Sequence, residues 1–316
     1  MEPPYSIDGW RLDVAADLGC SKEFNHDFWR RFRETVKETN PDALIVAEHY
    51  GDVRDWMMGD QWDTVMNYDA FMDPVSWYMT GVDKHSESFR DAAIANLSEF
   101  KETMDYACRR MVTPSLLCAM NELSNHDHSR FITRTNHKAG RVAQLGSEAA
   151  AEDINPAIFK EAVLMQLTWP GAPTIYYADE AGQVGFTDPD NRRTYPWDNP
   201  DQGLIDFHRD MIFLHRSSEA LRKGSFNFLY CGRNFVSYAR FTKREKIVVA
   251  INCGADSMDA VVPVWTAGIE KDCTLDQVMV SYPGGYSIMP VKRQVKDGRL
   301  AISLLAYTAV VLRASV

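Results

Sequence analysis

The feature that most constrains the fold is the alternation of short apolar runs with helical patterns over the first two thirds of the chain. Runs with strand character cover residues 5–14, 43–48, 62–68, 115–123 and 172–178, and helical patterns cover residues 25–39, 88–112, 156–168 and 203–222. Alternation of this kind predicts βα units arranged around a parallel sheet.

The pattern changes after residue 222. From residue 223 to residue 316, short alternating runs such as NFVSYARF and KIVVAIN are separated by Gly and Asp clusters. Such a pattern predicts an antiparallel β-sandwich. A chain of 316 residues is long enough for two ordinary domains. We therefore expect one domain at residues 1–222 and a second at residues 223–316.

Charge and cysteine content narrow the classes of partner and compartment. The formal net charge is -10 without a block of Lys or Arg, so we expect neither nucleic acid nor an anionic membrane as a partner. Residues 1–20 lack the pattern of a signal peptide, and no apolar stretch reaches the roughly 18–20 residues that span a bilayer. The six cysteines form no CxxC pair, which is typical of reduced thiols in a cytoplasmic protein.

Three of the predicted strands end in, or are soon followed by, an acid: Asp13, Glu48 and Asp127. The carboxyl ends of parallel strands meet at one edge of the sheet, where functional groups gather. A single acid there is well explained as a hydrogen-bonded structural group or a helix cap, but three in corresponding places favour a shared site. Two facing carboxylates suit glycoside hydrolysis, because one attacks or stabilises the sugar cation and the other protonates the leaving oxygen.

Arg11 stands two residues before Asp13, so both side chains point to the same face of the predicted strand. A fixed guanidinium lowers the pKa of a neighbouring carboxyl group, which would keep Asp13 ionised as a nucleophile. The alternative interpretation of the pair is a buried structural ion pair.

Four sequence stretches carry a specific resemblance to a known family. They are DGWRLDVA (8–15), IVAEHYGD (45–52), SNHDHSR (124–130) and GAPTIYYADEAG…DPDNRRTYPW (171–197). In this order they resemble four sequence regions of the α-amylase superfamily, and in particular its neopullulanase, cyclomaltodextrinase and maltodextrin-glucosidase branch. The resemblance covers nearly the whole chain and implies a retaining α-glucoside hydrolase. The fold it implies is α/β, with strands four to eight of a partial (β/α)8 TIM barrel followed by an all-β sandwich domain.

The resemblance also implies roles for the residues that match these motifs. Asp13 would be the nucleophile that forms a covalent glucosyl-enzyme, and Glu48 the general acid and then the base. Asp127 would hold sugar hydroxyls and stabilise the distorted transition state. Arg11 would orient Asp13, and His126 would bind a hydroxyl of the sugar in the cleaved subsite.

Other positions carry open alternatives. Asp188 and Arg192 match a pair that contacts the next sugar, although a turn-forming loop explains them equally well. Asp17 would touch the leaving-group side, or serve as an acid at a helix N-terminus. Ala178 stands where relatives usually have Gly, which makes the local backbone uncertain. For Trp10 we expect core packing rather than sugar stacking.

The resemblance leaves part of the family pattern unmatched. The first strand here corresponds to the fourth barrel strand, so the first three βα units are not matched. The motif after the third strand, which in many members supplies a calcium ligand, is not matched either. We expect no required cofactor and no metal ligands here, with calcium remaining an option. Unpaired sheet edges and exposed inward side chains favour association, so we expect a homo-oligomer or a complement to the missing N-terminal half.

The function expected from the resemblance is hydrolysis of α-1,4 bonds in maltodextrins, with α-1,6 bonds as an option. An α-glucan oligosaccharide would be the substrate. The alternative is a catalytically inactive fragment that retains at most glucan binding or oligomerisation. A nucleotide enzyme is disfavoured, because neither GxGxxG nor a P-loop is present.

Overall fold

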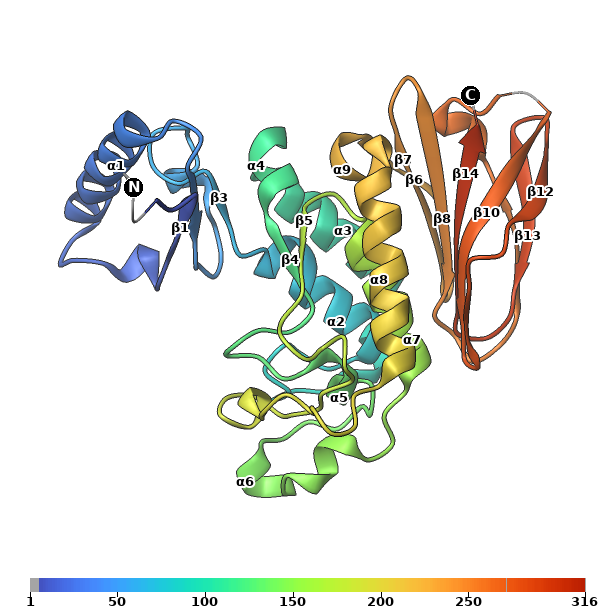
Figure 1. The fold of residues 1–316 in the computed structure, drawn as a ribbon, viewed down its shortest axis with the longest axis horizontal. Helices are drawn as coiled ribbons and strands as arrows, with labels where there is room; N and C mark the ends of the chain where they lie inside the picture. Colours follow the sequence, from blue (N-terminus) through green and yellow to red (C-terminus); the bar gives the residue numbers. More distant parts are fainter. Residues whose placement is uncertain (1–5, 271, 316) are drawn as a thin grey trace. The chain divides into compact units, whose positions relative to one another are not determined.

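The computed structural model describes residues 6–270 and 272–315, which form two compact units (Figure 1). Of the described residues, the first unit combines 6–72, 102–122 and 171–174, and the second combines 73–101, 123–170, 175–270 and 272–315. Each unit groups segments that lie close together in space but are separated in the sequence. The units therefore do not test the predicted domain boundary between residues 222 and 223, which stays a prediction. Of the predicted strand at 5–14, Tyr5 lies outside the described residues.

The described residues of the first unit include the parallel strands β1 to β5. Strands β1 (Gly9–Leu12), β2 (Leu44–Ala47) and β3 (Thr64–Val65) form one sheet in that order, and β4 (Met120–Glu122) pairs with β5 (Ala172–Thr174). A parallel bridge between Met66 and Met120 connects the two sheets. The predicted strands in the first two thirds of the chain are thus present, parallel and in chain order, although each is shorter than predicted.

Helix α1 (Lys22–Thr39) lies between β1 and β2 and confirms the helix predicted at residues 25–39. It begins after Ser21, whose hydroxyl accepts a hydrogen bond from the Phe24 amide at 3.2 Å. This is the usual role of an N-cap serine. The helix ends before Pro41, which cannot continue it. Trp29 and Val36 bury its inner face. The short helices of this part of the chain are η1 (Ala15–Asp17), η2 (Arg54–Trp56) and the π-helix η3 (Tyr68–Met72).

Two predictions in the middle of the chain are wrong in part. Residues 115–118, expected to begin the strand at 115–123, belong to helix α4 (Thr113–Cys118), and only β4 remains of the strand. Pro114 favours the first turn of a helix, and a short apolar run does not distinguish a strand from a buried helix. The helix predicted at 88–112 is confined to η4 (Asp91–Ala93) and α3 (Leu97–Cys108).

The second unit contains the remaining helices. They are α2 (Asp73–Thr80), α5 (Phe131–Arg134), α6 (Val142–Leu145), η5 (Glu148–Ala151), α7 (Pro156–Thr168), η6 (Asp190–Arg192), α8 (Gln202–Ser217), α9 (Glu219–Lys223) and η7 (Val264–Ala267). Helix α7 has the predicted bounds and is buried on all sides from Ala157 to Thr168. The helix predicted at 203–222 is divided at Ser218, whose hydroxyl caps α9. None of the helices that the structure describes is long and apolar enough to cross a membrane.

The C-terminal part of the second unit is an antiparallel all-β domain, as predicted. Its strands are β6 (Ser225–Gly232), β7 (Phe235–Phe241), β8 (Glu245–Asn252), β9 (Met258–Val262), β10 (Cys273–Tyr282), β11 (Gly285–Ser287), β12 (Val291–Lys296), β13 (Arg299–Leu304) and β14 (Thr308–Ser315). They form one hydrogen-bonded sheet in the order β6-β7-β8-β14-β10-β12-β13-β9, with β11 paired to β10. Strands β6 and β9 at the two ends of this order contact each other. The sheet therefore curls around its core, where a sandwich of two separate sheets was expected.

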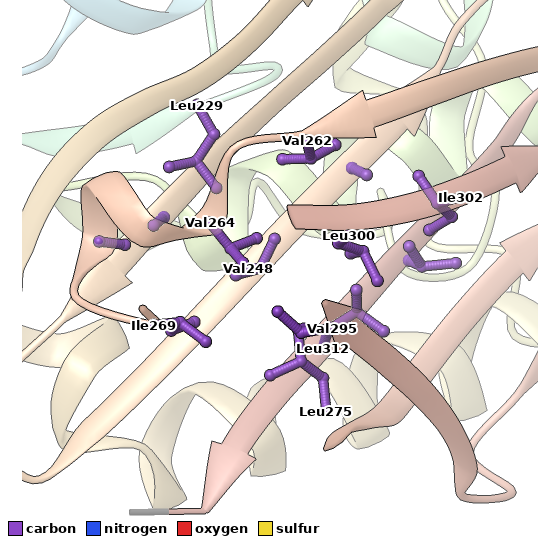
Figure 2. Packing of buried hydrophobic residues seen from close by; sticks show 14 of the residues in the cluster. Leu229, Val248, Val262, Val264, Ile269, Leu275, Val295, Leu300, Ile302 and Leu312 are labelled. Carbon is purple, nitrogen blue, oxygen red and sulfur yellow. The ribbon is translucent and has the colours of Figure 1, made fainter. Parts of the chain in front are cut away.

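The core of this domain is aliphatic (Figure 2). Leu300 on β13, Leu275 on β10 and Leu312 on β14 are fully buried in it. Helix α7 is held against the outside of the sheet by Lys160, whose ammonium group donates to the carbonyl oxygens of Tyr282 (2.7 Å) and Gly285 (2.9 Å). The aliphatic interior thus stabilises the domain, and polar contacts fix the helix that covers it.

Truncation of one core residue tests this packing. We expect Leu300→Ala to lower the free energy of unfolding by about 2–5 kcal/mol, because it removes buried methyl groups and leaves a cavity. Urea unfolding followed by circular dichroism measures this change. The matched control is Leu305→Ala, which truncates a leucine that is 71% exposed and should stay within about 0.5 kcal/mol of the wild type. Equal losses in both variants would contradict the assigned core.

Candidate active site

In the first unit, Arg11 contacts both predicted catalytic carboxylates. Its Nη1 lies 2.5 Å from Oδ1 of Asp13, and its Nη2 lies 2.7 Å from Oε1 of Glu48. The register of the parallel strands explains this geometry, because Leu12 pairs with Ala47 and the two acids come directly after these residues. The structure therefore brings together three residues that the sequence placed on two separate strands. Sequence analysis paired Arg11 with Asp13 and missed its contact with Glu48.

The two carboxylates differ in their surroundings. The side chain of Asp13 is 76% exposed, whereas that of Glu48 is 5% exposed. Glu48 also accepts hydrogen bonds from the Val14 amide at 3.1 Å and from the Tyr68 hydroxyl at 3.4 Å. One acid is thus open to a ligand, and the other is held in place by several donors.

Arg11 is a permanent cation between these groups. Burial lowers the pKa of Arg11, but the hydrogen bond to Asp13 and the charges of Glu48 and Asp13 outweigh burial and raise it overall. A guanidinium is already protonated at any physiological pH. The chain therefore supplies a fixed positive charge to both carboxylates.

The segment after Asp13 has an unusual backbone. Val14 adopts the left-handed conformation with φ 42° and ψ 45°, which is rare for a β-branched residue. Asp17 follows at the end of η1, where its side chain is exposed and its amide donates to the carbonyl oxygen of Val14 at 3.0 Å. Asp17 therefore lies on the loop that follows Asp13, and its contact with the leaving-group side stays a prediction.

In the second unit, the other four predicted site residues gather on two neighbouring loops. Nε2 of His126 and Nη2 of Arg192 each lie 3.6 Å from Oδ1 of Asp127. Nε of Arg192 lies 2.7 Å from Oδ1 of Asp188 and donates to the carbonyl oxygen of His126 at 2.9 Å. All four side chains are between 36% and 47% exposed. The cluster can therefore offer hydrogen bonds to a polar ligand.

Sequence reasoning missed the residues that join these two loops. Asn191 is fully buried, and its Nδ2 donates to the carbonyl oxygens of Asn125 and His128, each at 2.8 Å. The Asp188 amide donates to the carbonyl oxygen of Asp127 at 3.3 Å, and the Thr187 hydroxyl donates to the same oxygen. The signal was available, because Asn191 lies within DPDNRR, but a motif does not show that an amide points inward.

Arg130, the last residue of the SNHDHSR motif, has its ion-pair partner on another segment of the chain. Arg130 is fully buried and pairs with Asp179 at 2.9 Å. Burial raises the pKa of Asp179, although the charge of Arg130 opposes this rise. Ala178, which precedes this pair in the sequence, is buried with φ 66°. It therefore occupies the left-handed region that glycine prefers.

His128 gives a test of this scaffold. Burial lowers the pKa of His128 to about 2, and the positive charges of His85 and Arg134 add to the effect. The unfolded chain takes up this proton near pH 6.5, so the stability from neutral His128 is complete above about pH 6.5 and is lost as the pH falls. Between pH 6.5 and pH 5, we expect wild type to lose about 2 kcal/mol that the variant His128→Gln does not lose.

Urea unfolding at the two pH values measures this difference. The control is His137→Gln, which changes an exposed histidine of the same unit and should keep the pH dependence of the wild type. If the free energy of unfolding falls as much between pH 6.5 and pH 5 in His128→Gln as in the wild type, this result would contradict a buried, neutral His128.

Comparison with known proteins agrees with this fold. The native debranching enzyme of Nostoc punctiforme superposes with a TM-score of 0.76 at 29% identity, covering 98% of this chain and 58% of that one. Neopullulanase 2 of Thermoactinomyces vulgaris is 32% identical over 314 residues, which is 97% of this chain and 45% of that protein. The cyclomaltodextrinase of Thermoanaerobacter pseudethanolicus is 34% identical over 256 residues, which is 78% of this chain and 37% of that protein.

These likenesses define the class as an α/β catalytic domain with a C-terminal β-domain. The family model of the α-amylase catalytic domain matches residues 3–223, so the chain belongs to the α-amylase family. The resemblance to its neopullulanase and cyclomaltodextrinase branch is confirmed. The chain spans less than half the length of both of these relatives.

Proposed function

We propose that this chain carries the catalytic carboxylates of a retaining glycoside hydrolase that acts on α-glucosidic bonds. The observation that supports the proposal most is the Arg11 guanidinium, which contacts Asp13 and Glu48 together. Retaining enzymes hold their two carboxyl groups about 5–5.5 Å apart, closer than the roughly 6.5–9.5 Å of inverting enzymes. Contact with one guanidinium keeps the two acids close, which supports the retaining mechanism.

The proposed reaction has two steps. An Asp13 oxygen attacks the anomeric carbon while the bond to the leaving oxygen breaks, and protonated Glu48 gives its proton to that oxygen. Ionised Glu48 then takes a proton from water, the hydroxide attacks the anomeric carbon, and the bond to Asp13 breaks. Two inversions give net retention. The reaction uses the chain's own carboxylates and water, so we propose no required cofactor, and calcium stays a prediction from the resemblance.

The remaining site residues are proposed to bind the sugar. Asp127 and His126 present their side chains together, and we assign to them the hydroxyls of the sugar in the cleaved subsite. The ion pair of Asp188 and Arg192 is half exposed and is assigned to the next sugar. Asp17 is assigned to the leaving-group side. The names of the relatives include neopullulanase and cyclomaltodextrinase, so we propose maltodextrin α-1,4 bonds as the substrate and α-1,6 bonds as the second option.

Substitution of the two acids tests the proposed chemistry. We expect Asp13→Asn and Glu48→Gln each to reduce hydrolysis of maltotriose by at least about a thousandfold, because each removes a group that makes or breaks a bond. The matched control is Asp27→Asn, an exposed acid on α1, which should keep the wild-type rate. NMR of the first product formed should show the α-anomer. Full activity in Asp13→Asn, or a β-anomeric first product, would contradict the proposal.

The alternative function is that of a non-catalytic chain that associates with another chain. The strand edge and the exposed aromatic side chains of the first unit favour this alternative. Among the described residues, β1 has a hydrogen-bonded neighbour on one side only. Trp10 on β1 is 42% exposed and contacts Phe32 of α1, and Phe24 and Phe28 of α1 are 50% and 39% exposed. Trp10 is thus not a core residue, contrary to expectation. We propose that this aromatic face and free edge pair with a second copy or with a complementary N-terminal half.

Solution mass tests the association. We expect the purified chain to have a mass above that of the 35.9 kDa monomer, and we expect Phe28→Glu to shift the distribution toward monomer, because a charge opposes burial of the aromatic face. The control is Phe213→Glu, which changes a phenylalanine of α8 that is 73% exposed and should leave the mass unchanged. A monomeric wild type would contradict association with a second copy.

The compartment is also a proposal. Cys20, Cys108, Cys118, Cys253 and Cys273 are free thiols in the structure, which is typical of a reducing environment. We propose a cytoplasmic location, an α-glucan oligosaccharide as the partner, and neither nucleic acid nor a membrane.

A further inference from the structure

The buried residue Asn25 of α1 holds the segment that follows Asp13. Its Nδ2 lies 2.9 to 3.1 Å from the carbonyl oxygens of Ala15, Ala16 and Leu18. These three residues belong to the connection between β1 and α1. Asn25 is 3% exposed, so these bonds form in an interior where an unpaired carbonyl is costly.

Two tryptophans fix Asn25 and its main target. The Nε1–H of Trp56 donates to Oδ1 of Asn25 at 2.7 Å, which also sets the orientation of the amide. The Nε1–H of Trp29 donates to the carbonyl oxygen of Ala15 at 2.8 Å. Both indoles are less than 10% exposed. The connection is therefore held from its inner side by three buried neutral side chains.

On the other side, the same connection faces Glu48. The Val14 amide donates to Oε2 of Glu48 at 3.1 Å, and the Ala15 amide donates to the Glu48 carbonyl oxygen at 3.2 Å. Between these two amides lies the Val14 backbone, which is left-handed with φ 42° and ψ 45°. Such a conformation persists only when its surroundings determine it, and the bonds of Asn25 begin at the very next residue.

We propose that Asn25 is a positioning residue of the site, which holds Val14 in its left-handed conformation and thereby fixes the Val14 amide on the Glu48 carboxylate. Asp13 and Glu48 are then connected twice, through the Arg11 side chain and through the Val14 backbone. The inference rests on the proposed function for its catalytic meaning, while the geometric statement stands on the contacts alone.

The test measures the rate of hydrogen exchange at the Val14 amide in the chain labelled with 15N-valine. The Val14 signal is identified by its loss in the variant Val14→Ile. We expect hydrogen exchange at Val14 to be at least about tenfold faster in Asn25→Ala than in wild type, because the hydrogen bond to a charged acceptor is weakened. In preparations with turnover, we expect kcat to fall about tenfold and KM to stay the same, since orientation rather than substrate binding is lost.

The chain offers a closely matched control. Asn252 is also fully buried, and its Nδ2 donates to the carbonyl oxygens of Asp256, Leu304 and Leu305 in the C-terminal β-domain. Asn252→Ala removes a comparable clamp and should leave exchange at Val14 unchanged. If Asn25→Ala does not fold, Trp29→Phe decides, because it keeps the ring packing and removes one bond to Ala15; about threefold faster exchange is then expected.

Unchanged exchange at Val14 in a folded Asn25→Ala, or equal acceleration in Asn252→Ala, would overturn the proposal. In Trp29→Phe, exchange at the wild-type rate would do the same. A wild-type chain without turnover would count against the proposed function only, because the exchange measurement does not depend on catalysis.

Discussion

The contact of one guanidinium with two carboxylates is the interaction on which the first half of the site depends. Arg11 reaches Asp13 and Glu48 from one strand. Two acids this close repel each other when both are ionised, and the cation between them lowers that repulsion. An arginine suits this position because it stays charged and has two forks of donors. The parallel pairing of β1 and β2 supplies the geometry, since it brings the two strand ends level.

The sequence predicted the parts of the fold that rest on pattern and composition. Helix α7 has its predicted bounds, because Asn155 caps it and Pro156 opens it. The predicted strands lie at the right places in the sequence but are longer than the observed strands, because each apolar run continues into the neighbouring loop. The start of the strand predicted over residues 115–123 is instead part of helix α4, because an apolar run of this length fits a strand and a buried helix equally. The curled single sheet could not be predicted, since the order of strands is set by contacts between distant residues.

The sequence motifs identified the candidate catalytic and sugar-binding residues of the site. The structure identified the residues whose hydrogen bonds hold the loops that carry them. Asp127 and Arg192 stand more than sixty residues apart in the sequence, and only the fold brings their charged atoms to 3.6 Å. Arg130 lies in the SNHDHSR motif, but the motif does not show its ion-pair partner, since Asp179 lies on another segment. The sequence shows the chemical type of a polar residue, whereas its hydrogen-bonding or ion-pair partner depends on which loops the fold places together.

The residues around Asp13 and those around Asp127 share one structural feature. In each group, the side-chain amide of a buried asparagine holds the loop. Asn25 clamps the loop of Asp13, and Asn191 clamps the loop of Asp127, each through a buried Nδ2 that donates to main-chain carbonyl oxygens. A lysine or arginine in these places would also donate, but its charge would act on the nearby carboxylates and alter their protonation. A neutral amide fixes the backbone and leaves the electrostatics to Arg11 and Arg192. The neutral amides therefore add hydrogen bonds that hold the loops without adding charge, beside the charged Arg192, which itself donates to the carbonyl oxygen of His126.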